Sequence, residues 1–179
     1  MAFAKLSCAI IFLISLFSTI EGCDTFPNGT ETKLHWYAPI IRGFKIIDIQ
    51  LSYTNGSTEY PLALEKTIYV QMELINNGPS YYNLNLTLQL WSFGGWQGCS
   101  WHLIPTFGLL RNLDACSYGL SCPIPQGKNE MSIKLDLSPF DSVISLLQND
   151  KTYQLQYVLT DRDTGDETCL MIQARSLTH

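Results

Sequence analysis

The sequence predicts an all-β fold, a sandwich of two antiparallel sheets, and three observations lead to this class. Short segments in which apolar and polar residues alternate, the pattern of half-buried strands, recur along the chain. Turn signals such as Asn55-Gly56 and Asn76-Asn77-Gly78-Pro79 separate them. The chain of 179 residues holds about six or seven such segments and no internal repeat or linker. This number of short strands fits one sandwich domain.

The N-terminal segment, residues 1–22, is predicted to be a secretory signal peptide. Lys5 precedes an apolar run from Leu6 to Phe17 that only Ser7 and Ser15 interrupt, and small and polar residues follow up to Gly22. The run is too short for a membrane span and is flanked as a signal peptide is. The mature chain is then expected to enter the secretory pathway as a single domain, residues 23–179.

The first predicted strand covers residues 44–53, and its alternation puts two sets of side chains on opposite sides. The apolar side holds Ile47, Ile49, Leu51 and Tyr53, and the polar side holds Asp48, Gln50 and Ser52. The same alternation predicts strands over residues 67–75, 84–90, 131–137, 152–160 and 168–174. Residues 141–150 have apolar side chains at helical spacing after Ser138-Pro139, and they are the candidate helix.

The stretch from residue 84 to residue 110 changes character half-way. Its first half places four leucines on one side of a strand, which predicts one face in the core. Its second half gathers tryptophan, phenylalanine and leucine among glycines and a proline, a composition typical of loops. Such side chains either close one end of the core or stay exposed for a ligand, a partner or a membrane. The pattern leaves both alternatives open.

The cysteines indicate an oxidising compartment. Of the six, Cys8 lies in the predicted signal peptide, which leaves Cys23, Cys99, Cys116, Cys122 and Cys169. Cys116 and Cys122 form a natural short clamp, because Gly119 between them can turn the chain. Cys23 and Cys169 lie near the two ends of the domain, and a bridge between them would leave Cys99 as a buried free thiol or an intermolecular bridge.

Three sequons, at Asn28, Asn55 and Asn85, are candidate glycosylation sites in a secreted chain. A glycan on Asn85 would require the polar face of the strand over residues 84–90 to point to solvent. The leucine face of that strand would then point inward.

Charge and motifs argue against several functional classes. The formal net charge of −5 gives no basic footprint for nucleic acid. Asp163-Thr164-Gly165 matches the short signature of aspartic proteases, but that chemistry needs two aspartates, and the run fits a hairpin turn better. We find no nucleophile motif and no zinc spacing. We therefore expect no catalysis, no metal and no cofactor.

One family pattern is present towards the C-terminus. The run CSYGLSCPI at residues 116–124, followed by Gly127, Tyr153 and a terminal strand with Cys169, resembles the ML domain family of secreted lipid-recognition proteins. The resemblance covers residues 116–177 and extends to Cys23. It implies an immunoglobulin-like sandwich that holds a lipid in an apolar cavity, the bridges Cys23–Cys169 and Cys116–Cys122, and a secreted or lysosomal location.

Together, the strand pattern and the resemblance predict a carrier of a sterol, glycolipid or fatty-acyl lipid that contacts membranes transiently. The alternative is a non-catalytic interaction module, in which the lipid is structural and a receptor or a lipid hydrolase is the partner. Periodicity by itself does not separate a filled core from a cavity. The residues expected to line the cavity are Ile68, Val70, Met72, Leu86, Leu88, Leu90, Ile133, Leu135, Leu155 and Tyr157, and those expected at its entrance are Phe93, Trp96, Trp101 and Phe107.

Overall fold

The computed structural model describes residues 23–38, 43–95 and 98–179. The predicted signal peptide and Trp96 lie outside the described residues. Within these ranges the strands are β1 (His35–Tyr37), β2 (Phe44–Tyr53), β3 (Leu62–Ala63), β4 (Ile68–Asn76), β5 (Leu84–Phe93), β6 (Trp101–Leu103), β7 (Leu113–Asp114), β8 (Gly127–Leu135), β9 (Lys151–Asp161) and β10 (Glu167–Leu177). The short helices are η1 (Pro27–Gly29), η2 (Ser138–Phe140) and α2 (Asp141–Ile144).

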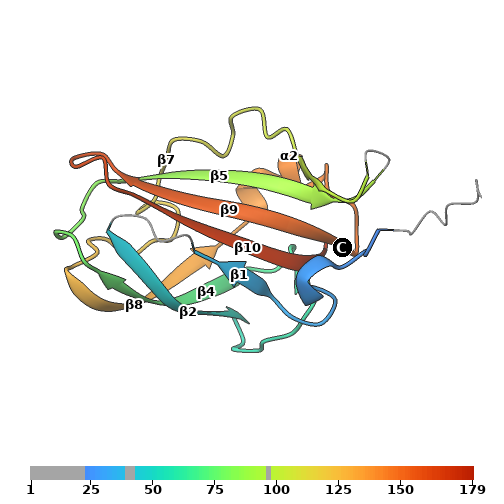
Figure 1. Cartoon of the computed structure of the whole chain (residues 1–179), viewed down its shortest axis with the longest axis horizontal. Helices are drawn as coiled ribbons and strands as arrows, with labels where there is room; N and C mark the ends of the chain where they lie inside the picture. The colour runs from blue at the N-terminus through green and yellow to red at the C-terminus, as the bar shows by residue number, and fades with distance from the viewer. Residues whose placement is uncertain (1–22, 39–42, 96–97) are drawn as a thin grey trace, which may run out of the picture.

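The strands form two sheets that pack as a sandwich, as the sequence predicted (Figure 1). The larger sheet has the order β1-β10-β9-β5-β6, with β3 added to β10 and β7 added to β5. The smaller sheet has the order β2-β4-β8. All pairs are antiparallel except β10 with β3, which is parallel.

The predicted inward faces meet in a common core. Leu84, Leu86 and Leu88 of β5 are 2%, 2% and 8% exposed, so the leucine face of this strand points inward. Ile68, Val70, Met72 and Leu74 are buried on the facing strand β4, and Leu159 and Leu170 are buried on β9 and β10. The alternating pattern thus predicted the inner faces of these strands. It was wrong at Ile47 of β2, which is 41% exposed because a β-bulge between Ile46 and Asp48 shifts the register of this strand.

The long strands agree with the prediction to within a few residues, whereas the short ones were not predicted. β1, β3, β6 and β7 contain two or three residues each. Segments of this length show no alternation, since a period of two needs several residues to appear. β8 also ends at Leu135, and Leu137 lies beyond it.

The candidate helix forms only in part. Ser138–Phe140 is a 3₁₀ turn, and α2 follows over Asp141–Ile144. Among its apolar residues Val143 is buried, whereas Leu146 is 48% exposed. The segment is therefore a short cap on the sandwich and not a packed helix.

The Asp163-Thr164-Gly165 run is a hairpin turn, as predicted. The amide and the hydroxyl of Thr164 both donate to Asp161 Oδ2, at 2.8 and 2.9 Å, and the Gly165 amide donates to the Asp161 carbonyl. This turn joins β9 to β10. The Tyr81 hydroxyl donates to Asp166 at 2.8 Å, and the pKa of Tyr81 rises to about 12, first because of burial and then because of Asp166.

The disulfides correct one prediction and confirm another. Cys116–Cys122 is bridged as expected, but Cys23 pairs with Cys99, not with Cys169. Cys169 is buried as a free thiol and accepts a hydrogen bond from Gln156. The predicted Cys23–Cys169 bridge was wrong because distance along the chain does not report distance in space. The Cys23–Cys99 bridge ties the N-terminal segment to the β5–β6 hairpin.

We expect peptide mapping under non-reducing conditions to recover Cys23 linked to Cys99. A thiol reagent should leave Cys169 unmodified in the native protein and modify it after unfolding, because this side chain is 5% exposed. A Cys23–Cys169 peptide, or rapid labelling of Cys99, would contradict this pairing.

Candidate functional site

An apolar cavity of about 130 Å³ lies between the two sheets. Its floor is built from deeply buried side chains of both sheets, among them Ile68 and Val70 of β4, which are 3% exposed, and Leu88 of β5. Leu155 of β9 and Ile172 of β10 complete this floor. The alternation of the strands brings them together, because every second side chain of a strand points to the same face.

The rim of the cavity lies around α2. Phe140, Val143, Ile144 and Leu147 from the η2–α2 segment line the cavity, together with Leu64 and Leu137. All of these except Val143 are half-buried, as are Leu51, Leu90, Leu135 and Leu155 elsewhere in the lining. Leu64, Leu137 and Ile144 also border a surface groove that contains the exposed Glu65 and Asp136, so the cavity lies close to solvent on this side. Short helical turns with few buried contacts open locally at low cost.

The predicted lining residues divide into three groups. Ile68, Val70, Leu88, Leu90, Leu135 and Leu155 line this cavity. Met72 and Tyr157 line a smaller apolar cavity of about 20 Å³ in the same core. Leu86 and Ile133 are buried without bordering either cavity. The rim residues 137–147 and Leu110 were not predicted, since the candidate helix and the loop gave no sign of which element they would face.

The aromatic residues expected at the entrance lie elsewhere. Phe93 and Trp101 face each other across the β5–β6 pair, with ring centroids 5.1 Å apart, and neither lines the cavity. Phe107 is 84% exposed and Leu109 is 48% exposed, while the neighbouring Leu110 is buried and lines the cavity. The loop therefore does both things that the sequence allowed: Leu110 closes part of the core, whereas Phe107 and Leu109 stay exposed at the surface.

A polar groove of about 230 Å³ adjoins the rim. It shares Leu64, Leu137 and Ile144 with the cavity. Its other lining residues are polar or charged: Glu65, Lys66, Thr67, Asp136, Ser138, Asp141 and Thr178. Lys66 lies 3.7 Å from Glu59, which offsets its positive charge. The carboxylates of Glu65, Asp136 and Asp141 therefore make the groove acidic.

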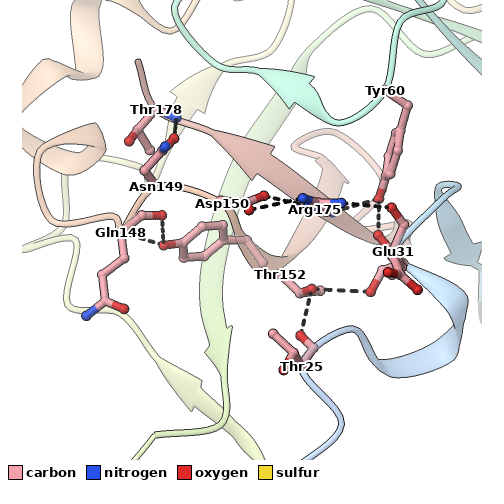
Figure 2. Close-up of polar contacts among 11 residues, drawn as sticks. Thr25, Glu31, Tyr60, Gln148, Asn149, Asp150, Thr152, Arg175 and Thr178 are labelled. Atoms are coloured by element: carbon pink, nitrogen blue, oxygen red, sulfur yellow. Dashed lines mark hydrogen bonds and ion pairs between the residues drawn. The ribbon is translucent and has the colours of Figure 1, made fainter.

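A cluster of polar contacts fixes the base of the segment that carries α2. Figure 2 shows the Asp150–Arg175 pair at its centre, and Arg175 Nη2 donates to Asp150 Oδ2 at 3.0 Å. The Tyr60 hydroxyl accepts from the Arg175 amide at 2.7 Å. At the other end, the Tyr153 hydroxyl donates to the Gln148 carbonyl at 2.8 Å. These contacts hold residues 148–150 against β9 and β10, so the rim has one fixed end.

Replacing Asp150 with asparagine is expected to lower Tm at pH 7 and at pH 5 to the same extent. Arg175 holds the pKa of the Asp150 carboxyl below the usual value of 3.8, first through the hydrogen bond and then through its charge. A lowered pKa means that the folded state favours the ionised form of Asp150. The stabilisation by the Asp150–Arg175 pair is therefore complete above pH 3.8 and is lost as the pH falls further. When Tm is measured by thermal unfolding from pH 7 to pH 2.5, the plots of Tm against pH for the wild type and for Asp150→Asn should therefore converge only at the acidic end. A difference in Tm that is unchanged at the lowest pH would contradict this account.

The asparagines of the three sequons differ in how exposed they are. Asn28 and Asn55 are exposed, although Asn28 Nδ2 donates to Gln173 at 2.6 Å. Asn85 is half-buried, and its side chain contacts Asn112 and Arg162. Glycosylation at these positions stays a prediction.

Among residues 23–38, 43–95 and 98–179, no three His, Cys, Asp or Glu side chains come together as a metal site. In the same ranges, no helix has the length and apolar character needed to cross a membrane.

Comparisons with known proteins give distant similarities. No family model matches the chain. A Caenorhabditis elegans protein named heh-1 is 33% identical over 66 residues, which cover 35% of this chain and 38% of that protein. Among solved structures, a Niemann-Pick type C2 protein from the Japanese carpenter ant is similar with a TM-score of 0.48 and 13% identity, over 79% of this chain and 98% of that one. The C-terminal domain of wzt is similar with a TM-score of 0.40 and 12% identity, over 87% of this chain and 86% of that one.

Proposed function

We propose that this chain binds a lipid through its hydrocarbon chain, between the two sheets, and carries or presents it without chemical change. The observation that carries the proposal is the apolar cavity of about 130 Å³ whose rim is the short α2 segment. Sandwich cores normally pack without voids of this size. The two disulfides fit a protein that acts in an oxidising compartment.

The size of the cavity favours a slim ligand. An apolar cavity of roughly 150 Å³ accommodates benzene, so the closed site holds about six carbon atoms. At about 0.8 kcal/mol per buried methylene this gives about 5 kcal/mol, a Kd in the sub-millimolar range. Micromolar binding therefore requires the α2 segment to move outward and admit a longer chain. An acyl chain needs less movement than a fused-ring sterol, because it is narrower.

The surroundings of the rim bear on the polar end of the ligand. A headgroup at the rim would meet the groove that contains Glu65, Asp136 and Asp141. Like charges in close contact are unfavourable, so we infer a neutral or cationic headgroup and not a phosphate.

Native mass spectrometry of the protein purified from its natural source, followed by lipid extraction, tests the proposal. A stoichiometric lipid that is released on unfolding is the expected result. Protein that is free of lipid and bound to a receptor or a hydrolase would contradict it and would support the interaction module instead.

Exposed apolar side chains next in sequence to cavity residues would make contact with membranes during exchange. Phe107 and Leu109 precede the cavity residue Leu110, and Leu146 precedes the cavity residue Leu147. Exposed apolar residues next to a binding site often mark the surface that meets a partner or a membrane.

Replacing Phe107 and Leu109 together with serine is expected to slow lipid uptake from neutral liposomes several-fold. Each exposed side chain that enters the bilayer interface contributes roughly 1–2 kcal/mol to the encounter. Transfer of a fluorescent acyl lipid between vesicles measures the rate. Tyr82→Ser is the matched control, because Tyr82 is 67% exposed but precedes β5 at the end away from Leu90. Equal slowing by both variants, or no slowing by the double variant, would remove the membrane role from this loop.

A further inference from the structure

The η2–α2 segment, residues 137–147, is attached to the sandwich mainly through its apolar side chains. Among the described residues, each hydrogen bond that this segment makes has its partner within residues 136–147. Segments with few bonds to the rest of a fold open locally at low cost. The segment can therefore move as a unit about its fixed end at residues 148–150, and the packing of its side chains is what opposes this movement.

Phe140 connects this segment to a part of the fold outside the cavity. Its side chain lines the cavity, and the ring of Tyr118 lies beside it with the two ring centroids 5.9 Å apart. Tyr118 is 39% exposed and lines neither of the two apolar cavities. Aromatic rings at this separation attract one another by more than the apolar area that they bury. Phe140 is thus in contact both with the cavity and with Tyr118.

The loop that carries Tyr118 is held in place. The Cys116–Cys122 bridge closes this loop. Gly119 packs directly against the backbone of β8, since a β-carbon there would lie 2.3 Å from the Lys134 carbonyl oxygen. The ring of Tyr118 is therefore a fixed point against which the η2–α2 segment moves.

An acyl chain that is longer than the closed cavity has to displace this segment. The closed site holds about six carbon atoms, so a longer chain must push Phe140 outward. Outward movement either separates the ring of Phe140 from that of Tyr118 or presses the two rings together. Tyr118 opposes the movement in both cases, whereas a chain that fits the closed cavity does not meet this opposition.

We infer that Tyr118 determines which chain lengths the site accepts, because it holds Phe140 over the cavity from outside. Tyr118 is a positioning residue, since it acts on the ligand through Phe140. This inference rests on the proposed lipid-binding function and specifies its selectivity. Loss of the Tyr118 ring should strengthen the binding of long chains and leave that of short chains unchanged, whereas damage to the fold would weaken both.

The test compares 1-hexanoylglycerol with 1-dodecanoylglycerol, two neutral lipids that differ only in chain length, by isothermal titration calorimetry. Tyr118→Leu should bind 1-dodecanoylglycerol about 2- to 10-fold more tightly than the wild type does, the range of one aromatic pair. Its Kd for 1-hexanoylglycerol should be unchanged. Tyr118→Phe keeps the ring and should bind both lipids as the wild type does. Tyr37→Leu is the matched control, because Tyr37 is 44% exposed and pairs with the His35 ring but lines neither cavity.

The NMR signals of the Tyr118 ring in the wild type give a second readout. They should shift when 1-dodecanoylglycerol is bound and stay in place when 1-hexanoylglycerol is bound. Unchanged signals with the longer lipid bound, or no gain in affinity of Tyr118→Leu for it, would overturn the inference and leave the lipid-binding proposal standing. A gain for both lipids, or an equal gain in Tyr37→Leu, would also overturn it. Failure of both lipids to bind to the wild type would remove the proposed function itself.

Discussion

Replacing Val70 with phenylalanine is expected to abolish binding of acyl lipids and to leave the fold intact. Val70 lies on β4, the central strand of the smaller sheet, and its side chain lines the cavity. The added ring atoms would occupy a large part of the 130 Å³. A ligand that loses about four methylenes of burial loses about 3 kcal/mol, which is more than a 100-fold increase in Kd.

The fold should tolerate this change because the new atoms enter empty space. Overpacking of a filled core costs about 1–3 kcal/mol. Displacement of a fluorescent fatty acid measures binding, and thermal unfolding measures stability. Val158→Phe is the matched control, since Val158 is a half-buried residue on the opposite face of β9. A Val70→Phe protein that binds as the wild type does would show that lipid does not enter this cavity. A large fall in Tm would show that the space is already filled.

Replacing Gly119 with alanine is expected to cause a large loss of stability. Gly119 has a φ of +96°, and a β-carbon there would lie 2.3 Å from the Lys134 carbonyl oxygen. The left-handed backbone costs about 1–2 kcal/mol for a residue with a β-carbon, and the clash with the backbone of β8 adds about 1–3 kcal/mol. Together these lower Tm by roughly 5–15 °C.

Gly165→Ala separates the two causes. Gly165 has a φ of +74°, but no atom lies within 4 Å of a β-carbon built there. Its replacement should therefore cost only the backbone term, a fall in Tm of roughly 5 °C or less. Equal losses for the two variants would show that the loop between Cys116 and Cys122 moves away from β8 freely.

Much of the fold was predictable because long strands carry their own signature. The alternation in residues 44–53 and 84–90 identified β2 and most of β5, and the acidic run after residue 160 gave the turn between β9 and β10. These features depend on neighbours within a few residues, which the sequence shows directly.

The candidate site was predictable only where it lies on those strands. Leu88 and Leu155 were expected at the cavity and lie there. The rim was missed because Phe140 and Leu147 belong to irregular segments without a period. Phe93 and Trp101 were expected at the entrance, but they lie in register across the β5–β6 pair, and a pairing of that kind depends on the hairpin and not on composition.

The sequence by itself therefore determined the fold class, the inner faces of the long strands apart from the bulged start of β2, and the Cys116–Cys122 bridge. All of these follow from local pattern and short separations along the chain. The tertiary structure alone decided the pairing of Cys23 with Cys99 and which irregular segments line the cavity. These features depend on which distant segments become neighbours and on how completely their side chains fill the space between the sheets. Neither property produces a periodic pattern in the sequence.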